Sequence, residues 1–137
     1  MIIKRPNFKK LFETNKLVVG YDFEYAWLVN KISGKEIYLG GFYGDPSCGI
    51  ISTENNYCLV GGSYLYLWRE GKGVVEIEDD HLQWIVQFRQ IAPFQIEILI
   101  DPWSDHGSIW SLNIETLIAE KVRDYRLDDE YSDKITW

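Results

Sequence analysis

Apolar and polar side chains alternate along much of this chain, and the alternation is clearest in residues 82–90, LQWIVQFRQ. The apolar residues that share one face of this segment are Leu82, Trp84, Val86 and Phe88. Ile85 is the only apolar residue on the other face, and a helical period of 3.6 fits the segment less well. Because a strand repeats its faces every two residues, the pattern predicts a strand with those four side chains turned to the core.

Similar segments, rich in aromatic and β-branched residues, recur between turn sequences that contain Gly, Asn, Asp or Pro. They fall at 23–31, 35–40, 57–61, 64–69, 73–78, 95–101 and 109–114, and 47–53 pairs with 57–62 as a hairpin. Short strands spaced about 8–12 residues apart are typical of sandwiches and barrels. We therefore expect an all-β protein, an antiparallel sandwich or half-barrel of about 8–10 short strands.

Helix is expected only as a minor component. Phe8, Leu11 and Phe12 have helical spacing, so a single helical turn is predicted within residues 6–12. Residues 116–125 fit a helix face about as well as a strand. The final residues, 135–137, predict a last strand that docks on the rest of the chain.

Two segments resemble parts of a β-propeller blade. Residues 56–68 predict a strand, a tight turn and a second strand that ends in Trp68, and residues 107–116 predict a similar strand and turn. A closed propeller needs at least four blades of about 40 residues, more than 137 residues provide. We therefore expect only local likeness to a propeller, unless several chains assemble to complete one.

The composition indicates one soluble, ordered domain that spans residues 1–137. Aromatic residues make up 15% of the chain, which argues against disorder. No run approaches the roughly 18 apolar residues that a membrane-spanning helix needs. The first residues, MIIKRP, are not followed by the apolar stretch of a secretory signal. We expect a cytoplasmic protein that does not enter a membrane.

The two cysteines are expected to remain free thiols. In the predicted hairpin Cys58 lies opposite Thr53, and Cys48 lies opposite Ser63. This register places the two sulfur atoms far apart on different faces of a sheet, whereas a disulfide needs Cβ atoms about 4 Å apart.

Charge is distributed unevenly along the chain. Residues 1–69 carry eight Lys and Arg against six Asp and Glu, a net +2, whereas residues 70–137 carry six against fifteen, a net −9. Nucleic-acid binding needs a basic surface, so the acidic half argues against a nucleic-acid partner. An acidic surface suits a basic protein partner, although net charge also serves solubility.

Few residues offer catalytic chemistry. Asp101, Asp105 and His106 lie close together and could hold a base or a metal ion, but their spacing matches no common metal site. Asp105-His106-Gly107 is better explained as a turn. Cys48 has no neighbouring base to activate it. We therefore expect a protein that is not an enzyme and that uses neither a metal nor another cofactor.

The acidic residues form two clusters that we interpret as a partner-binding surface. In the strand predicted at 73–78, Glu76 and Glu78 share the solvent-facing side and lead into further acids. The partner-binding residues predicted from the two clusters are Glu76, Glu78, Asp79, Asp80, Asp128, Asp129, Glu130 and Asp133.

One stretch carries a resemblance to a known class of proteins. The segment GGFYGDPSCGII (40–51), followed by the hairpin that ends at Trp68, is similar to immunity proteins of bacterial polymorphic-toxin and contact-dependent growth inhibition systems. The resemblance implies a non-catalytic protein that binds a cognate toxin, often a basic nuclease, and occludes its active site. It carries over no individual residue role.

Three other functions stay open at this stage. A carbohydrate- or small-ligand-binding β-module would use Trp103 and Trp110 if they line an open face. A small hydrolase would use Asp101, Asp105 and His106. A structural subunit would pair an exposed edge strand with another chain.

Overall fold

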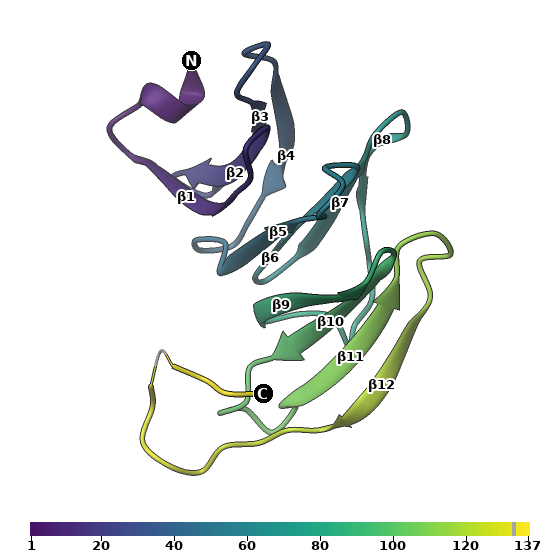
Figure 1. The fold of residues 1–137 in the computed structure, drawn as a ribbon. Coiled ribbons are helices and arrows are strands. Elements are labelled where there is room, and N and C mark those ends of the chain that lie inside the picture. The colour runs from purple at the N-terminus through teal and green to yellow at the C-terminus, as the bar shows by residue number, and fades with distance from the viewer. Residues whose placement is uncertain (133) are drawn as a thin grey trace.

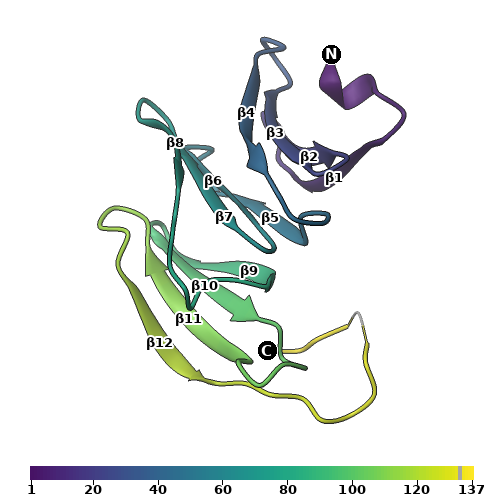
Figure 2. The same ribbon diagram turned by 180° about the vertical axis from the view of Figure 1, so that it is seen from behind.

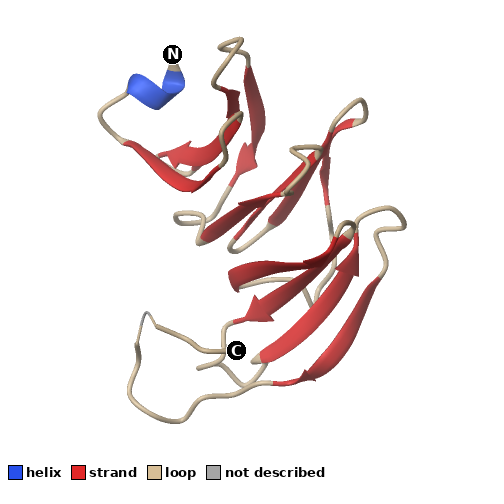
Figure 3. Cartoon of the chain, in the orientation of Figure 1, coloured by secondary structure: helices blue, strands red, loops and turns tan. Residues whose placement is uncertain are grey.

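The computed structural model describes residues 1–132 and 134–137. In this part of the chain, twelve strands form three four-stranded antiparallel sheets, preceded by a short 3-10 helix, η1 (Ile2–Lys4) (Figure 3). The strands of the first sheet are β1 (Phe8–Glu13), β2 (Leu17–Asp22), β3 (Tyr25–Asn30) and β4 (Glu36–Gly41). Those of the second are β5 (Cys48–Ile51), β6 (Tyr57–Gly61), β7 (Leu65–Arg69) and β8 (Gly73–Glu76). Those of the third are β9 (Ile85–Ala92), β10 (Gln95–Ile100), β11 (Ser108–Asn113) and β12 (Ala119–Asp124).

Each sheet is a meander, in which every strand pairs with the next one along the chain. The three sheets lie one after another in a stack, the first at one end and the third at the other (Figures 1 and 2). Of their first strands, β1 contacts β5, and β5 contacts β9. The sheets therefore follow the chain order in space as well as in sequence.

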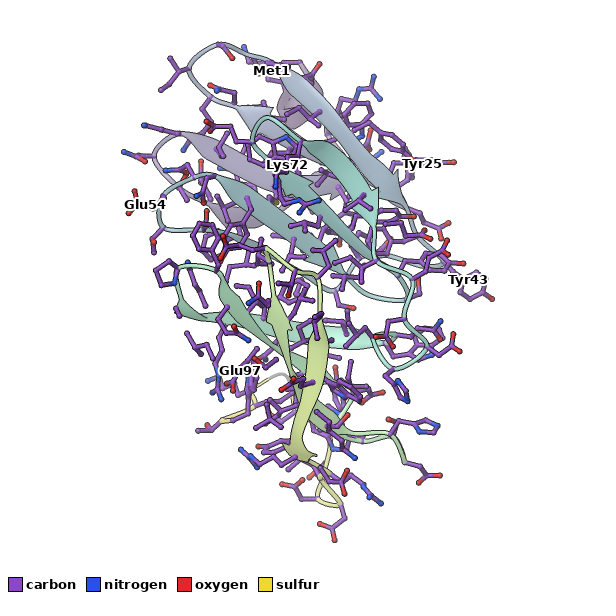
Figure 4. All side chains as sticks on the ribbon, turned by 90° about the vertical axis from the view of Figure 1, so that its right-hand side faces the viewer. Met1, Tyr25, Tyr43, Glu54, Lys72 and Glu97 are labelled. Carbon is purple, nitrogen blue, oxygen red and sulfur yellow. The ribbon has the colours of Figure 1, made fainter. Side chains whose placement is uncertain are left out.

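Apolar side chains fill both spaces between the sheets (Figure 4). The larger cluster includes Leu59 and Leu67 of the second sheet and Ile98 of the third, and the smaller includes Leu28 of the first sheet and Val60 of the second. Because the second sheet is buried on both faces, all five residues of β6 are buried. Burial on both faces removes the alternation that marks a half-exposed strand.

Tyr66 of β7 packs closely against β4, between the first and second sheets. A Cβ atom on Gly40 would lie 2.3 Å from Cζ of Tyr66, so only glycine leaves room for the ring. The Tyr66 hydroxyl donates a hydrogen bond to the carbonyl of Gly41 at 2.7 Å. The ring of Phe42 packs edge-on against Tyr66, with 5.3 Å between the ring centroids.

Terminal residues cover the two outer faces of the stack. On the first sheet, Val18 and Val29 pack with Ile2 of η1. On the third sheet, Leu99 and Ile109 are cross-strand partners on the face turned away from the second sheet, and both are buried. Trp137 lies over this face (the outer face of the third sheet), because its indole bonds to Gln87, the cross-strand partner of Leu99.

Four contacts hold the last residues there. The indole nitrogen of Trp137 donates to Oε1 of Gln87 at 2.5 Å. The guanidinium of Arg89 lies 4.1 Å from the centroid of the Trp137 ring and also donates to the Trp137 carbonyl. The Tyr125 hydroxyl donates to the carbonyl of Thr136 at 2.6 Å.

The predicted antiparallel all-β fold is confirmed. The described residues contain twelve strands rather than 8–10, in three sheets where a sandwich has two. The helical turn predicted within residues 6–12 is wrong, because Phe8–Glu13 is a strand and the only helical turn among the described residues is η1. Residues 119–124 form a strand, and 135–137 dock without forming one.

The predicted facing of residues 82–90 is confirmed for Leu82 and Phe88, which pack in the larger apolar cluster, and is wrong for Trp84. Ile85 is fully buried, whereas Trp84 is 57% exposed. Trp84 has a φ of 57° just before β9, and an irregularity in the pairing of β9 with β10 between Ile85 and Gln87 lets both Ile85 and Phe88 face the core.

The cysteines are free, as predicted, and pack in different apolar clusters. The predicted hairpin register is wrong, because Cys58 pairs with Ile51 and Cys48 pairs with Gly61. Within residues 1–132 and 134–137, no helix has the length and apolar character needed to cross a membrane.

Candidate functional site

Four of the predicted partner-binding acids line one hollow. Glu76 ends β8, and Glu78, Asp79 and Asp80 follow in the connection to β9. They surround a hollow of about 430 Å³ (the acidic hollow), together with Ser63, Tyr64, Ile77, Leu82 and Gln83. Among the described residues that line the acidic hollow, none is Lys, Arg or His. The hollow therefore has a strongly negative potential.

The carboxylates of the acidic hollow are close enough to perturb one another. A hydrogen bond to Glu76, and then the negative charge of Glu76, raise the pKa of Glu78 above its ordinary value. Burial, and then the charge of Glu76, raise the pKa of Tyr66 to about 12. Neighbouring carboxylates repel each other when both are ionised, and a nearby cation stabilises the ionised form of both.

The tail acids lie elsewhere. Asp128, Asp129 and Glu130 are exposed in the segment that follows β12. Figures 1 and 2 place this segment and the chain that leaves β8 on opposite sides of the stack. Asp133 lies outside the described residues. The seven predicted residues that the structure describes therefore do not form one surface, and the acidic hollow contains only the first four.

A second hollow of about 860 Å³ (the aromatic groove) adjoins the acidic hollow and shares Asp80 and Gln83 with it. The chain segments that form it are the end of the β8–β9 connection, the β10–β11 loop, β11 and β12 with the residues that follow it. Its aromatic and charged lining residues are Asp80, His81, Trp84, Asp101, Asp105, His106, Trp110, Lys121, Asp124 and Arg126.

Stacked rings form one wall of the aromatic groove. The rings of His81 and Trp110 lie 4.9 Å apart at an interplanar angle of 23°. The indole nitrogen of Trp110 donates to Oγ of Ser108 at 2.9 Å, which fixes the ring from β11. The backbone amide of His81 donates to Oδ1 of Asp79 at 2.9 Å, which fixes the turn that presents the imidazole. The first bond orients the Trp110 ring, and the second orders the turn that carries His81.

The residues considered for a hydrolase line the aromatic groove, but their hydrogen bonds shape the loop. Asp101 Oδ1 accepts the amide of Trp103 at 3.0 Å, and Ser104 Oγ accepts the amide of His106 at 3.2 Å. A Cβ atom on Gly107 would lie 2.4 Å from the Tyr125 carbonyl oxygen. This geometry fits the turn interpretation of residues 105–107. In the described part of the chain, no group of three or more His, Cys, Asp and Glu could hold a metal ion.

The structure separates the two tryptophans proposed for a ligand-binding module. Trp110 lines the aromatic groove, whereas Trp103 packs against Tyr131 at 4.8 Å between ring centroids, beside a different hollow. The residue that sequence reasoning missed is Trp84, which the alternation had placed in the core. The signal for it was the apolar Ile85 on the wrong face, which marks a shift in strand phase.

Comparisons with known proteins bear on the fold alone. No protein-family model matches the chain, and no curated protein matches it. The crystal structure of the WD40 β-propeller domain of Doa1 is similar to this chain, with a TM-score of 0.57 at 14% sequence identity. The match covers 83% of this chain and 38% of that one.

The fold is therefore that of three consecutive propeller-type blades, each a four-stranded meander. The likeness expected only locally, in residues 56–68 and 107–116, extends across most of the chain. The chain spans 38% of the length of the propeller that it matches, so it corresponds to part of such a ring.

Proposed function

We propose that this chain is a non-catalytic immunity protein, which binds and neutralises a cognate toxin domain in the bacterial cytoplasm. The class of function comes from the resemblance of residues 40–68 to immunity proteins. The observation that carries the binding surface is the acidic hollow, where Glu76, Glu78, Asp79 and Asp80 surround one space without a lining cation.

The chemistry of the acidic hollow favours a basic partner. Glu76 and Glu78 repel each other, so a lysine or arginine side chain between them would be attracted by both carboxylates. The same charges repel phosphate, which argues against direct binding of nucleic acid. A nuclease that uses a cationic cleft to bind its substrate has the complementary surface, and complementary charge speeds association.

The test is co-purification of the tagged chain with the product of the gene directly upstream, across a salt series. We expect a one-to-one complex that weakens with salt and in which the partner is no longer toxic. Absence of a complex, together with an upstream product that is harmless when expressed alone, would refute the proposed function.

Charge reversal locates the surface. Glu76→Lys with Glu78→Lys should slow association by about 10-fold or more, because oriented charges raise on-rates by factors of 10–10³. The matched control is Asp128→Lys with Asp129→Lys, which changes net charge equally on the tail. Asp79 is left unchanged because it accepts the amide of His81. Equal slowing in the two double variants would show a non-specific charge effect and remove the acidic hollow from the interface.

A further inference from the structure

Trp84 is presented to solvent by a left-handed backbone conformation just before β9. Its φ of 57° is in the left-handed region, which is unfavourable for a large side chain, and its side chain is 57% exposed. The carbonyl of Trp84 accepts the amide of Asp101 at 3.0 Å, and the next amide, of Ile85, donates to Gly62 at 2.9 Å. The chain is thus held on both sides of a strained residue, an arrangement that is frequent at binding sites.

The charges around this ring are unbalanced. Lys121 and Arg126 both pair with Asp124, and the four carboxylates of Asp80, Asp101, Asp105 and Asp124 against these two cations leave the lining of the aromatic groove a net charge of −2. Asp80 and Asp105 have no ion-pair partner within residues 1–132 and 134–137, and the side chain of each is exposed. The groove therefore combines an open indole face with carboxylates that lack a counter-charge.

We propose that the aromatic groove binds one cationic side chain, arginine or lysine, of a protein partner. The cation lies over the Trp84 ring and pairs with the carboxylates of Asp80 and Asp105. A neutral sugar could stack on Trp84 but would leave both carboxylates uncompensated, so the charge favours a cation. The volume of about 860 Å³ lies within the range of ordinary ligand pockets.

This inference rests on the proposed function for the identity of the partner, because the aromatic groove adjoins the acidic hollow through Asp80 and Gln83. The two hollows would receive neighbouring basic residues of one protein. Because Glu76 and Glu78 do not line the groove, the charge reversal described above leaves it intact.

The test uses the chain alone with defined peptides. Tri-arginine is titrated while the indole N–H resonances of Trp84 and Trp110 are followed by NMR, and tri-citrulline serves as the uncharged control of the same shape. We expect saturable shifts of both resonances with tri-arginine and at least fivefold weaker binding of tri-citrulline. Equal binding of the two peptides, or saturation by maltotriose without a response to tri-arginine, would overturn the inference and in the second case favour a carbohydrate site.

Substitutions of Trp84 distinguish the contribution of its ring from that of its backbone conformation. Trp84→Gly removes the ring and relieves the strained φ, and Trp84→Asn keeps a side chain that tolerates this conformation. Phe23→Gly is the matched control, because Phe23 has the same φ of 57° and is 64% exposed in the turn between β2 and β3. Both Trp84 variants should bind tri-arginine at least fivefold more weakly, with Phe23→Gly unchanged. Unchanged binding in a folded Trp84 variant would refute the role of the ring. The peptide result is independent of the toxin, so its failure and failure of the capture experiment are distinguishable.

Discussion

Replacement of Trp137 by alanine should uncover the outer face of the third sheet. The substitution removes the indole donor to Gln87 and the ring that lies over Arg89. Without these contacts, the last residues are held less firmly on this face. We expect lower stability and faster opening around Leu99 and Ile109, which are buried on the same face.

The expected loss follows from the contacts. A mostly buried tryptophan covers about 150–200 Å² of ring surface, and at about 25 cal/mol per Å² this stabilises the fold by at most about 4–5 kcal/mol. The last residue, once released, regains conformational entropy of about 2 kcal/mol. The net cost is therefore about 2–3 kcal/mol, which for a chain of this size lowers Tm by roughly 6–12 °C.

The assay is thermal and urea denaturation with amide hydrogen exchange at Leu99 and Ile109. Trp137→Phe is the informative control, since it keeps an aromatic ring over Arg89 and loses only the N–H donor, at a cost of about 1 kcal/mol. If Trp137→Ala melts within 2 °C of the wild type (roughly 0.5 kcal/mol) and exchange at both amides is unchanged, the tail does not stabilise this face.

Two further substitutions test the loop of the groove and the contact between the first two sheets. Gly107→Ala should destabilise the protein by about 1–3 kcal/mol, because the new Cβ meets the Tyr125 carbonyl oxygen at 2.4 Å and Cα of Pro102 at 2.8 Å, both of them backbone atoms; an unchanged urea midpoint would contradict this. The pKa of Tyr66 is raised to about 12, so the folded state favours the protonated phenol. The stabilisation that this provides is complete below about pH 10 and is lost as pH rises through 12. Tyr66→Phe should cost about 1 kcal/mol at pH 7 through the lost bond to Gly41 and should reduce the alkaline loss of stability, whereas an alkaline profile identical to that of the wild type would show that Tyr66 does not titrate this way.

The strands that the sequence predicted best are those with a polar neighbour at every second position or a clear turn at each end. Segments such as 35–40 and 95–101 were placed within one residue of β4 and β10. The two strands that were missed, β1 and β2, lie in the first sheet, and the segment that forms β12 was left undecided between helix and strand. β2 is buried on both faces, so it has no alternation to detect.

The error in β1 has the same origin. Phe8 packs on the outer face of the first sheet and Leu11 packs toward the second sheet, so a spacing of three places apolar residues on opposite faces of a strand. A helix with one buried face gives the same spacing. The strand is distinguished from a helix only by the packing of other parts of the chain on both of its faces, which is a feature of the tertiary structure.

The candidate site was predictable in part. The clustering of Glu76, Glu78, Asp79 and Asp80 follows from their closeness in sequence, and the structure adds that they surround a hollow. The separation of the tail acids depends on the path of the chain after β12, which local patterns do not encode. The exposure of Trp84 depends on one backbone angle, and its bulky side chain is unusual there.

The covered outer faces of the stack also determine how the molecule could aggregate. Solenoids and other linear repeats need polar terminal units because each inner unit presents an apolar surface to the next. Here Ile2 and Trp137 occupy the two places where another blade could add. A variant that releases one of these residues would expose an outer face on which a second molecule could stack. Such head-to-tail contacts do not close a ring, so they propagate into filaments. Light scattering of Trp137→Ala at high concentration would then show continued growth of filaments rather than formation of dimers.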